Sequence, residues 1–226
     1  MPPKRKRRKA PEDRPMNEEE WERFMQESDA RAAKFGELLE TFMDDPDRDA
    51  IIAREMGWDR PEEDEEEGDE DFDAQAAMEE AMAHADDEDV KEEVRRSHEE
   101  LRAMPAYKRA FPFALKVDRA LKKYLEACGG DPGDDVTIAH LNSMIIGAKL
   151  AGGHGMGYQD HALCGNIVCC KRALVAANKC LEALENLKAN KVVPEKTLDP
   201  LIAEGREVRR LVEERIAYLR KGVWWA

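Results

Sequence analysis

The chain has 226 residues and a formal net charge of −14, with 38% charged and 6% aromatic residues. This length fits one domain with extensions or two small domains, and only part of so charged a chain can form a packed core. The opening MPPKRKRRK is not an apolar signal segment, and the longest run without Asp, Glu, Lys or Arg has 13 residues, which excludes a spanning helix. We therefore expect a soluble cytoplasmic protein with reduced thiols, or a nuclear one in a eukaryote.

The charge is distributed in three blocks. Residues 1–10 carry six Lys or Arg and no acid, residues 11–100 carry 10 Lys or Arg against 36 Asp or Glu, and residues 101–226 carry 20 against 14. The net charges of the blocks are therefore +6, −26 and +6. Such asymmetry is typical of tails that act electrostatically on a partner or on the protein's own domain.

A basic tip opens the chain. Residues 1–16 are expected to be disordered because they contain almost no apolar residue. The tip is formed by Lys4, Arg5, Lys6, Arg7, Arg8 and Lys9. A cluster of this kind binds phosphates or serves as a nuclear import signal, and it serves equally well as a solubilising tail.

Residues 17–58 form a predicted helical arm. Asn17 and Glu20 have the spacing of a capping box, and a second short helix is expected after Asp45 and Pro46, ending at Gly57. The first helix carries aromatic residues at helical spacing, which are Trp21, Phe24, Phe35 and Phe42. These side chains are too apolar to lie free in water, so we expect this helix to dock on a partner, on a second copy or on the rest of the chain.

An acidic segment follows the arm. Residues 59–73 hold eleven acids and are expected to be a disordered linker. Residues 74–104 form a marginal helix with a thin apolar stripe that includes Met78, Met82 and Leu101.

The C-terminal part, residues 105–226, contains four amphipathic runs joined by short turns. The first ends at Gly129–Gly130, the second closes at Lys149, and the fourth begins with Asp199 as its cap. We find no strand pattern. These features predict an all-α protein, in which an up-down four-helix bundle follows an acidic, partly disordered N-terminal arm that carries amphipathic helices.

The stretch GGHGMGYQDHALCGNIVCC, residues 152–170, has the residue types of a metal site. His161 and Cys164 are three apart on one helix and His154 lies in the expected preceding loop, so these three are the candidate ligands. The glycines lack the lysine and hydroxyl of a phosphate loop and instead predict a turn between helices. Cys169, Cys170 and Cys180 fit the small-residue core of the third helix better than a chelating group.

The first helix of the expected bundle has a basic face. It is formed by Arg109, Lys116, Arg119 and Lys123. A solvated face is the simplest interpretation, and docking of nucleic acid or of the chain's own acidic segment is the alternative.

No constellation of catalytic residues or cofactor ligands emerges. A cysteine beside a histidine needs an electropositive, partly exposed site to be reactive, and the first turns of the third helix are apolar on nearly every side. We therefore expect a non-enzymatic interaction or regulatory protein without a cofactor, which recruits a protein or nucleic-acid partner, or another copy of itself, and no membrane. The alternative is a small-ligand or metal-binding helical bundle that uses His154, His161 and Cys164.

Overall fold

The computed structural model describes residues 14–58, 87–131 and 133–225, and within these ranges it is entirely helical. The seven helices described are α1 (Glu18–Thr41), α2 (Arg48–Met56), α4 (Glu88–Ala103), α5 (Pro105–Cys128), α6 (Asp135–Met156), α7 (Asp160–Ala189) and α8 (Glu195–Arg220). The predicted all-α class is confirmed. The basic tip (Lys4–Lys9), the acidic segment 59–73 and the Met78 and Met82 part of the expected marginal helix lie outside the described residues.

The chain divides into two compact units. The larger unit combines Met1–Trp21 with Ser97–Ala226, and the smaller unit spans Glu22–Arg96. No helix in the described ranges is long and apolar enough to cross a membrane.

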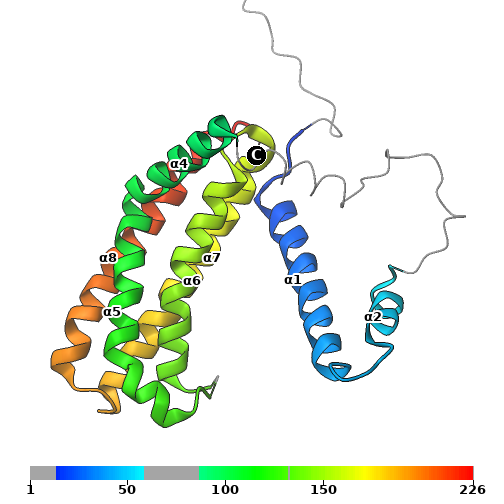
Figure 1. Cartoon of the computed structure of the whole chain (residues 1–226). Coiled ribbons are helices and arrows are strands. Elements are labelled where there is room, and N and C mark those ends of the chain that lie inside the picture. The colour runs from blue at the N-terminus through cyan, green and yellow to red at the C-terminus, as the bar shows by residue number, and fades with distance from the viewer. Residues whose placement is uncertain (1–13, 59–86, 132, 226) are drawn as a thin grey trace, which may run out of the picture. The chain divides into compact units, whose positions relative to one another are not determined.

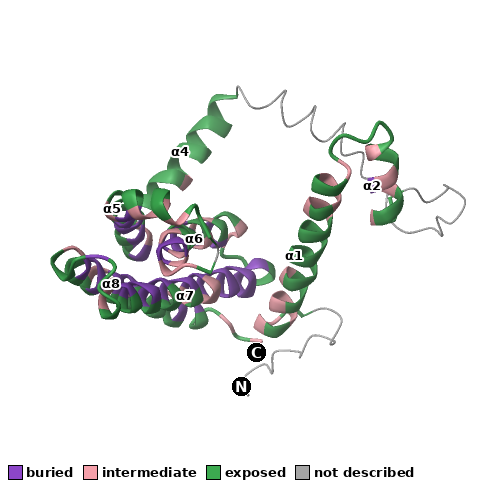
Figure 2. Ribbon diagram, turned by 90° about the horizontal axis from the view of Figure 1, so that it is seen from below, coloured by how far each residue is buried: buried purple, intermediate pink, exposed green. Residues whose placement is uncertain are grey.

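The core of the larger unit lies between helices α5 to α8 (Figure 1). Each of these helices packs against two others: α5 against α6 and α8, and α7 against α6 and α8. Figure 2 shows the buried residues concentrated on these four helices, whereas α4 is exposed. The largest fully buried side chains include Phe113, Leu121, Ile146, Leu150, Ile167, Leu184 and Leu198.

Local sequence signals start and stop these helices. The carboxylate of Asp134 accepts a hydrogen bond from the backbone N–H of Val136 at 2.7 Å and caps α6, a contact that is typically worth about 1 kcal/mol. Gly129 ends α5 in the left-handed region, with φ of 64°, where glycine is favoured because it has no Cβ. The prediction that the first amphipathic run of residues 105–226 ends at Gly129–Gly130 is therefore correct.

The expected turn after Lys149 is wrong. Helix α6 continues through Gly152, Gly153 and Gly155 to Met156. Among the glycines of this stretch, only Gly157 takes a positive φ, of 98°. One of them, Gly153, serves packing: a Cβ there would lie 2.9 Å from Oδ1 of Asn166 and 3.0 Å from Cβ of Cys169. Gly153 thus allows α6 and α7 to approach closely, and these two helices share the most extensive helix–helix interface.

The expected start of the last helix at Asp199 is also wrong. Helix α8 begins at Glu195, after Pro194, and includes Pro200 in its interior. Leu198 is fully buried, so the extra turn adds apolar surface to the core. The carboxylate of Asp199 pairs with Nζ of Lys188 at 2.6 Å instead of capping the helix.

In the smaller unit, α1 and α2 form a short helical hairpin. Ile52 is buried, the rings of Phe35 and Trp58 lie 5.6 Å apart, and Nζ of Lys34 donates to the carbonyl of Glu55. Helix α2 ends at Gly57 as predicted, in the left-handed conformation. It begins at Arg48, slightly later than expected.

Candidate ligand pocket

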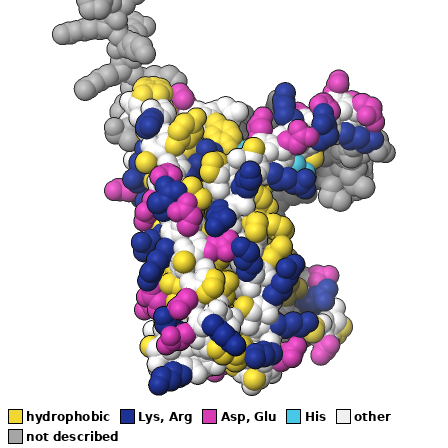
Figure 3. Space-filling view, turned by 90° about the vertical axis from the view of Figure 1, so that its left-hand side faces the viewer, with side chains coloured by type: hydrophobic (Ala, Val, Ile, Leu, Met, Phe, Trp, Pro, Cys, Tyr) yellow, Lys and Arg dark blue, Asp and Glu magenta, His cyan; other side chains and the backbone are white. Residues whose placement is uncertain are grey.

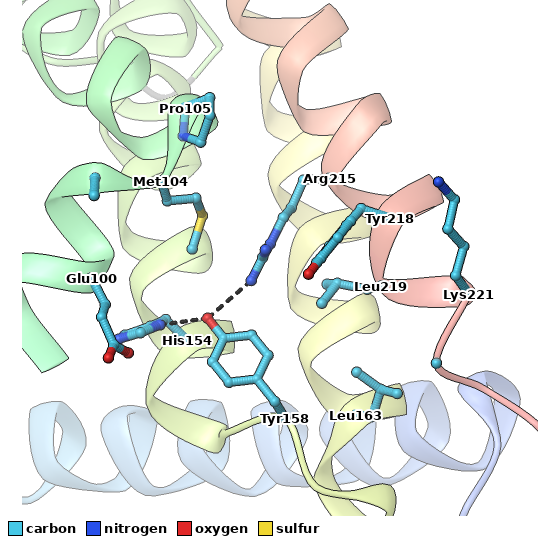
Figure 4. A pocket seen from close by; sticks show the side chains of 12 residues that line it. Glu100, Met104, Pro105, His154, Tyr158, Leu163, Arg215, Tyr218, Leu219 and Lys221 are labelled. Atoms are coloured by element: carbon cyan, nitrogen blue, oxygen red, sulfur yellow. Dashed lines mark hydrogen bonds between the residues drawn. The ribbon is translucent and has the colours of Figure 1, made fainter.

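A pocket of about 720 Å³ lies in the larger unit, where the end of α4, the start of α5 and the ends of α6 and α8 meet (Figure 4). Its apolar wall is formed by Ala103, Met104, Pro105, Leu163 and Leu219, together with the ring of Tyr218. Its polar groups come from Glu100, His154, Tyr158, Arg215 and Lys221. A mostly apolar concavity with a few converging polar groups is the usual form of a small-ligand site.

A chain of hydrogen bonds crosses the pocket wall. Nη2 of Arg215 donates to the hydroxyl of Tyr158 at 2.9 Å, and that hydroxyl lies 2.5 Å from Nδ1 of His154. Nε2 of His154 lies 3.0 Å from the carbonyl oxygen of Ser97 and 3.1 Å from its hydroxyl. Because a carbonyl can only accept, Nε2 carries the proton and Nδ1 accepts from Tyr158. Donor and acceptor are therefore assigned at each step: Arg215 donates to Tyr158, Tyr158 donates to His154, and His154 donates to Ser97.

The local sequence places these side chains. His154 belongs to the glycine-containing end of α6, and Tyr158 follows the positive-φ residue Gly157. The guanidinium carbon of Arg215 lies 5.3 Å from the ring centroid of Tyr158 and 5.5 Å from that of Tyr218. Contacts at these distances are cation–π interactions. Two rings and one hydrogen bond thus hold Arg215 in a single orientation.

The electrostatics of the pocket are dominated by Arg215. Its Nε is buried without a hydrogen-bond partner, and the guanidinium forms no ion pair with any carboxylate of the described residues. Burial raises the pKa of the Tyr158 hydroxyl, against the opposing effect of Arg215. Tyr158 is therefore a neutral phenol at neutral pH and does not supply a counter-charge.

The candidate metal ligands are not brought together. His154 is buried and both of its nitrogens are occupied, Cys164 is buried, and His161 is exposed. No group of three His, Cys, Asp or Glu side chains suited to a metal ion occurs in the described part of the chain. Burial, with a contribution from Glu18, raises the pKa of the Cys164 thiol and so disfavours the thiolate that binds metals.

The other cysteines occupy the core positions expected of them. Cys169, Cys170 and Cys180 are buried, and Cys128 is half-buried at the end of α5. Burial raises the pKa of Cys170 to about 11 and that of Cys180 to about 12. These thiols behave as small hydrophobic side chains and not as nucleophiles.

The four residues predicted to form a basic face of α5 are all exposed, and two of them are paired within the unit. The carboxylate of Glu204 on α8 lies 2.7 Å from Nζ of Lys116 and 3.5 Å from Nε of Arg109. Nζ of Lys123 lies 4.7 Å from the ring centroid of Tyr124, and Arg119 is exposed. Figure 3 shows a face of the molecule on which basic side chains alternate with acidic and hydrophobic ones.

The predicted partner helix is divided between the two units. Its first turn belongs to the larger unit, where Glu18 pairs with Arg220 at 2.7 Å and with Lys171 at 3.3 Å. Trp21 is half-buried there, with its ring placed so that a Cβ on Gly165 would lie 3.0 Å from it. In the smaller unit, Phe24 is exposed, and Phe35 and Phe42 are half-buried.

Arg215 and Tyr158 were not predicted from the sequence as site residues. One signal was available: Arg215 lies four residues from both Leu211 and Leu219, so it occupies the edge of the apolar stripe of α8. A charged side chain at the edge of an apolar stripe lies against the core and needs a hydrogen-bond or charge partner there.

No protein-family model, curated protein or solved structure matches this chain.

Proposed function

We propose that the protein is a non-enzymatic interaction protein, in which α5 to α8 form an up-down-up-down four-helix bundle and the acidic N-terminal part is an arm. The cyclic packing of α5, α6, α7 and α8 supports the bundle. The raised pKa values of the buried thiols and the occupied nitrogens of His154 favour binding over catalysis. We place the protein in the cytoplasm, or in the nucleus of a eukaryote.

One observation carries this proposal: the outer face of α6 is apolar and uncharged. Leu141, Met144 and Ile145 expose 50%, 42% and 38% of their surface. The sequence has no charged residue from Val136 to Ala148, a stretch whose only titratable side chain is His140. Exposed apolar patches with a polar rim are typical of protein–protein interfaces.

Helix α5 extends this face. Phe111 and Leu115 are exposed by 52% and 40% and share one side of α5 with Tyr107, whose ring centroid lies 6.0 Å from that of Phe111. The side chain of Tyr107 reaches Gly147 of α6, so this side of α5 borders the α6 face. We define the α5–α6 face as the exposed apolar residues Phe111, Leu115, Leu141, Met144 and Ile145 of these two helices.

The occupant that we propose for the α5–α6 face is a second copy of the chain. Copies of a protein with a net charge of −14 repel one another overall. The α6 part of this face has no charge to oppose or to desolvate, so two copies can meet there at the lowest electrostatic cost. A face used in this way by both copies gives a two-fold symmetric dimer.

Sedimentation equilibrium of the full chain over a concentration series tests the proposal. We expect a monomer–dimer equilibrium that Ile145→Lys weakens by about tenfold or more, because a charge would enter the centre of the interface. The control is Val192→Lys, which changes a 48% exposed residue of the connection between α7 and α8.

A monomer at every concentration would contradict the proposal, as would a dimer that tolerates Ile145→Lys. A dimer weakened equally by both substitutions would place the contact elsewhere and would also contradict it.

The nucleic-acid alternative is less well supported. Glu204 pairs with Arg109 and Lys116, two of the four α5 side chains predicted to form that surface together with the basic tip. The metal-binding alternative has no group of ligands among the described residues.

A further inference from the structure

We propose that the pocket around Arg215 binds a small organic carboxylate with an apolar body. This site is separate from the α5–α6 face, and the inference does not depend on self-association.

The first argument is the uncompensated charge of Arg215. Positive charges held against a protein interior are normally paired, because loss of hydration is costly unless a counter-charge replaces it. No carboxylate of the described residues pairs with Arg215, and the hydroxyl of Tyr158 and the two aromatic rings are neutral partners. An anion in the pocket would supply the missing charge.

The second argument is that Arg215 is held in position before a ligand arrives. The rings of Tyr158 and Tyr218 lie beside the guanidinium, and Tyr158 is itself held by His154 (Figure 4). The carbonyl oxygen of Ser97 orients His154 in turn. A planar guanidinium in a fixed orientation suits a planar carboxylate, to which it can donate two parallel hydrogen bonds. Such preorganisation lowers the entropic cost of binding.

The rest of the pocket determines the other properties of the ligand. Met104, Leu163 and Leu219 form an apolar wall in a volume of about 720 Å³, which favours a hydrocarbon or aromatic body. Lys221, which also lines the pocket, adds a second positive charge. Glu100 also lines the pocket, and its carboxylate opposes a second negative charge on the ligand. A monoanionic carboxylate therefore fits this set of charges better than a phosphate dianion.

Isothermal titration calorimetry of the full chain tests the inference, with octanoate as the probe. Octanamide is the neutral control of equal length, acetate is the control without an apolar body, and inorganic phosphate tests for a general anion site. We expect octanoate to bind at one site per chain, and the other three compounds to bind about tenfold more weakly or not at all.

Variants locate the site. Arg215→Gln is expected to weaken octanoate by about tenfold or more, and Arg215→Lys to restore only part of that loss because it keeps the charge without the planar fork. Arg209→Gln removes an equal charge from an exposed position of α8 where Glu213 lies 3.9 Å away, and it should bind as the wild type does. Thermal unfolding of each variant shows whether the fold is retained.

Three results would overturn the inference. They are the absence of octanoate binding, equal binding of octanoate and octanamide, and wild-type affinity of a folded Arg215→Gln variant. Tighter binding of phosphate than of octanoate would replace the carboxylate by a general anion and would also overturn it. If Arg215→Gln does not fold, the comparison of octanoate with octanamide on the wild-type chain still decides the matter.

Discussion

At the residue scale, glycine has two distinct uses in this chain. Gly57, Gly129 and Gly157 take positive φ angles at the ends of helices, where a Cβ would be strained. Gly153 is different, because it lies within α6 and its missing side chain is what allows contact with Asn166 on α7. The two uses look alike in sequence, but they respond differently to substitution.

Gly153→Ala is expected to lower the free energy of unfolding by about 1–3 kcal/mol, because the new Cβ meets side-chain and backbone atoms at 2.9–3.1 Å. The control is Gly155→Ala, on the same turn of α6, where a Cβ would meet nothing within 4 Å. This control should be neutral or stabilising by up to about 1 kcal/mol. Urea unfolding followed by circular dichroism gives both values, and equal effects would refute the packing role of Gly153.

The cysteines allow a second prediction at this scale. Burial raises the pKa of Cys170 to about 11 and that of Cys180 to about 12, so both thiols stay protonated and slow to react at pH 8. In the native chain, iodoacetamide should modify the half-buried Cys128 well before either of them. All five cysteines should react in urea. Mass spectrometry after timed quenching measures the order, and rapid native alkylation of Cys180 would argue against its burial.

At the element scale, sequence signals located those helix ends that depend on a local cap. The capping box at Asn17 is formed as expected, since its side chain accepts from the backbone N–H of Glu20 at 3.0 Å and the Glu20 carboxylate accepts from the N–H of Asn17 at 2.8 Å. Gly57 and Gly129 likewise end their helices. These signals could be read because all participating atoms lie within a few residues of one another.

Ends that depend on tertiary packing could not be predicted. The extension of α6 to Met156 follows from contact with α7, and the early start of α8 follows from burial of Leu198. The same limit applies to the pocket. His154 was singled out from its neighbours, but its partners Ser97 and Tyr158 come from other elements or turns, and only the fold brings them together.

The ion pairs of Glu18 in the first turn of α1 should make the stability of the protein depend on pH. Glu18 accepts two hydrogen bonds from Arg220 at 2.7 Å, which together with Lys171 hold the pKa of the Glu18 carboxyl below its ordinary value. This contribution to stability is complete above the ordinary glutamate pKa and is lost as the pH falls through the lowered pKa of the folded state. Glu18→Gln should therefore cost about 1 kcal/mol at pH 7 and nothing at strongly acidic pH.

Hydrogen exchange of residues 18–21 and urea unfolding measure this effect at several pH values. Glu19→Gln is the control, because Glu19 is exposed in the same turn and forms no ion pair with a described residue. A Glu18→Gln effect that persists unchanged at pH 2, or an equal effect of Glu19→Gln, would show that the ion pair is not its source.

At the scale of the whole molecule, stability is concentrated in one unit. Nearly all buried residues lie on α5 to α8, whereas α1 and the described part of α4 contain none. The smaller unit buries Ile52 alone among its described hydrophobic residues. Apolar burial is the main favourable term in folding. Residues 97–226 should therefore contain most of the apolar core that cooperative unfolding requires.

A fragment of residues 97–226 is expected to unfold cooperatively in urea, with a free energy of unfolding about 1–3 kcal/mol below that of the full chain. The difference represents the lost contacts of Glu18 and Trp21 with the larger unit. Circular dichroism at 222 nm measures both transitions. A gradual, non-cooperative transition of the fragment would mean that residues before 97 belong to the core.

The anchoring of the first turn of α1 has a topological consequence. Arg220 pairs with Glu18, and Nε1 of Trp225 donates to the carbonyl of Met16 at 3.4 Å, so the chain leaves the larger unit after Trp21 and rejoins it at Ser97. The 75 residues of Glu22–Arg96 are thus an insertion between two segments that both belong to the larger unit. The entropic cost of closing such an insertion grows only logarithmically, by about 0.6 kcal/mol for each doubling of its length. Insertions and deletions within residues 22–96 should therefore hardly change the free energy of unfolding of the larger unit. The length of this insertion can then be selected for function and not for stability.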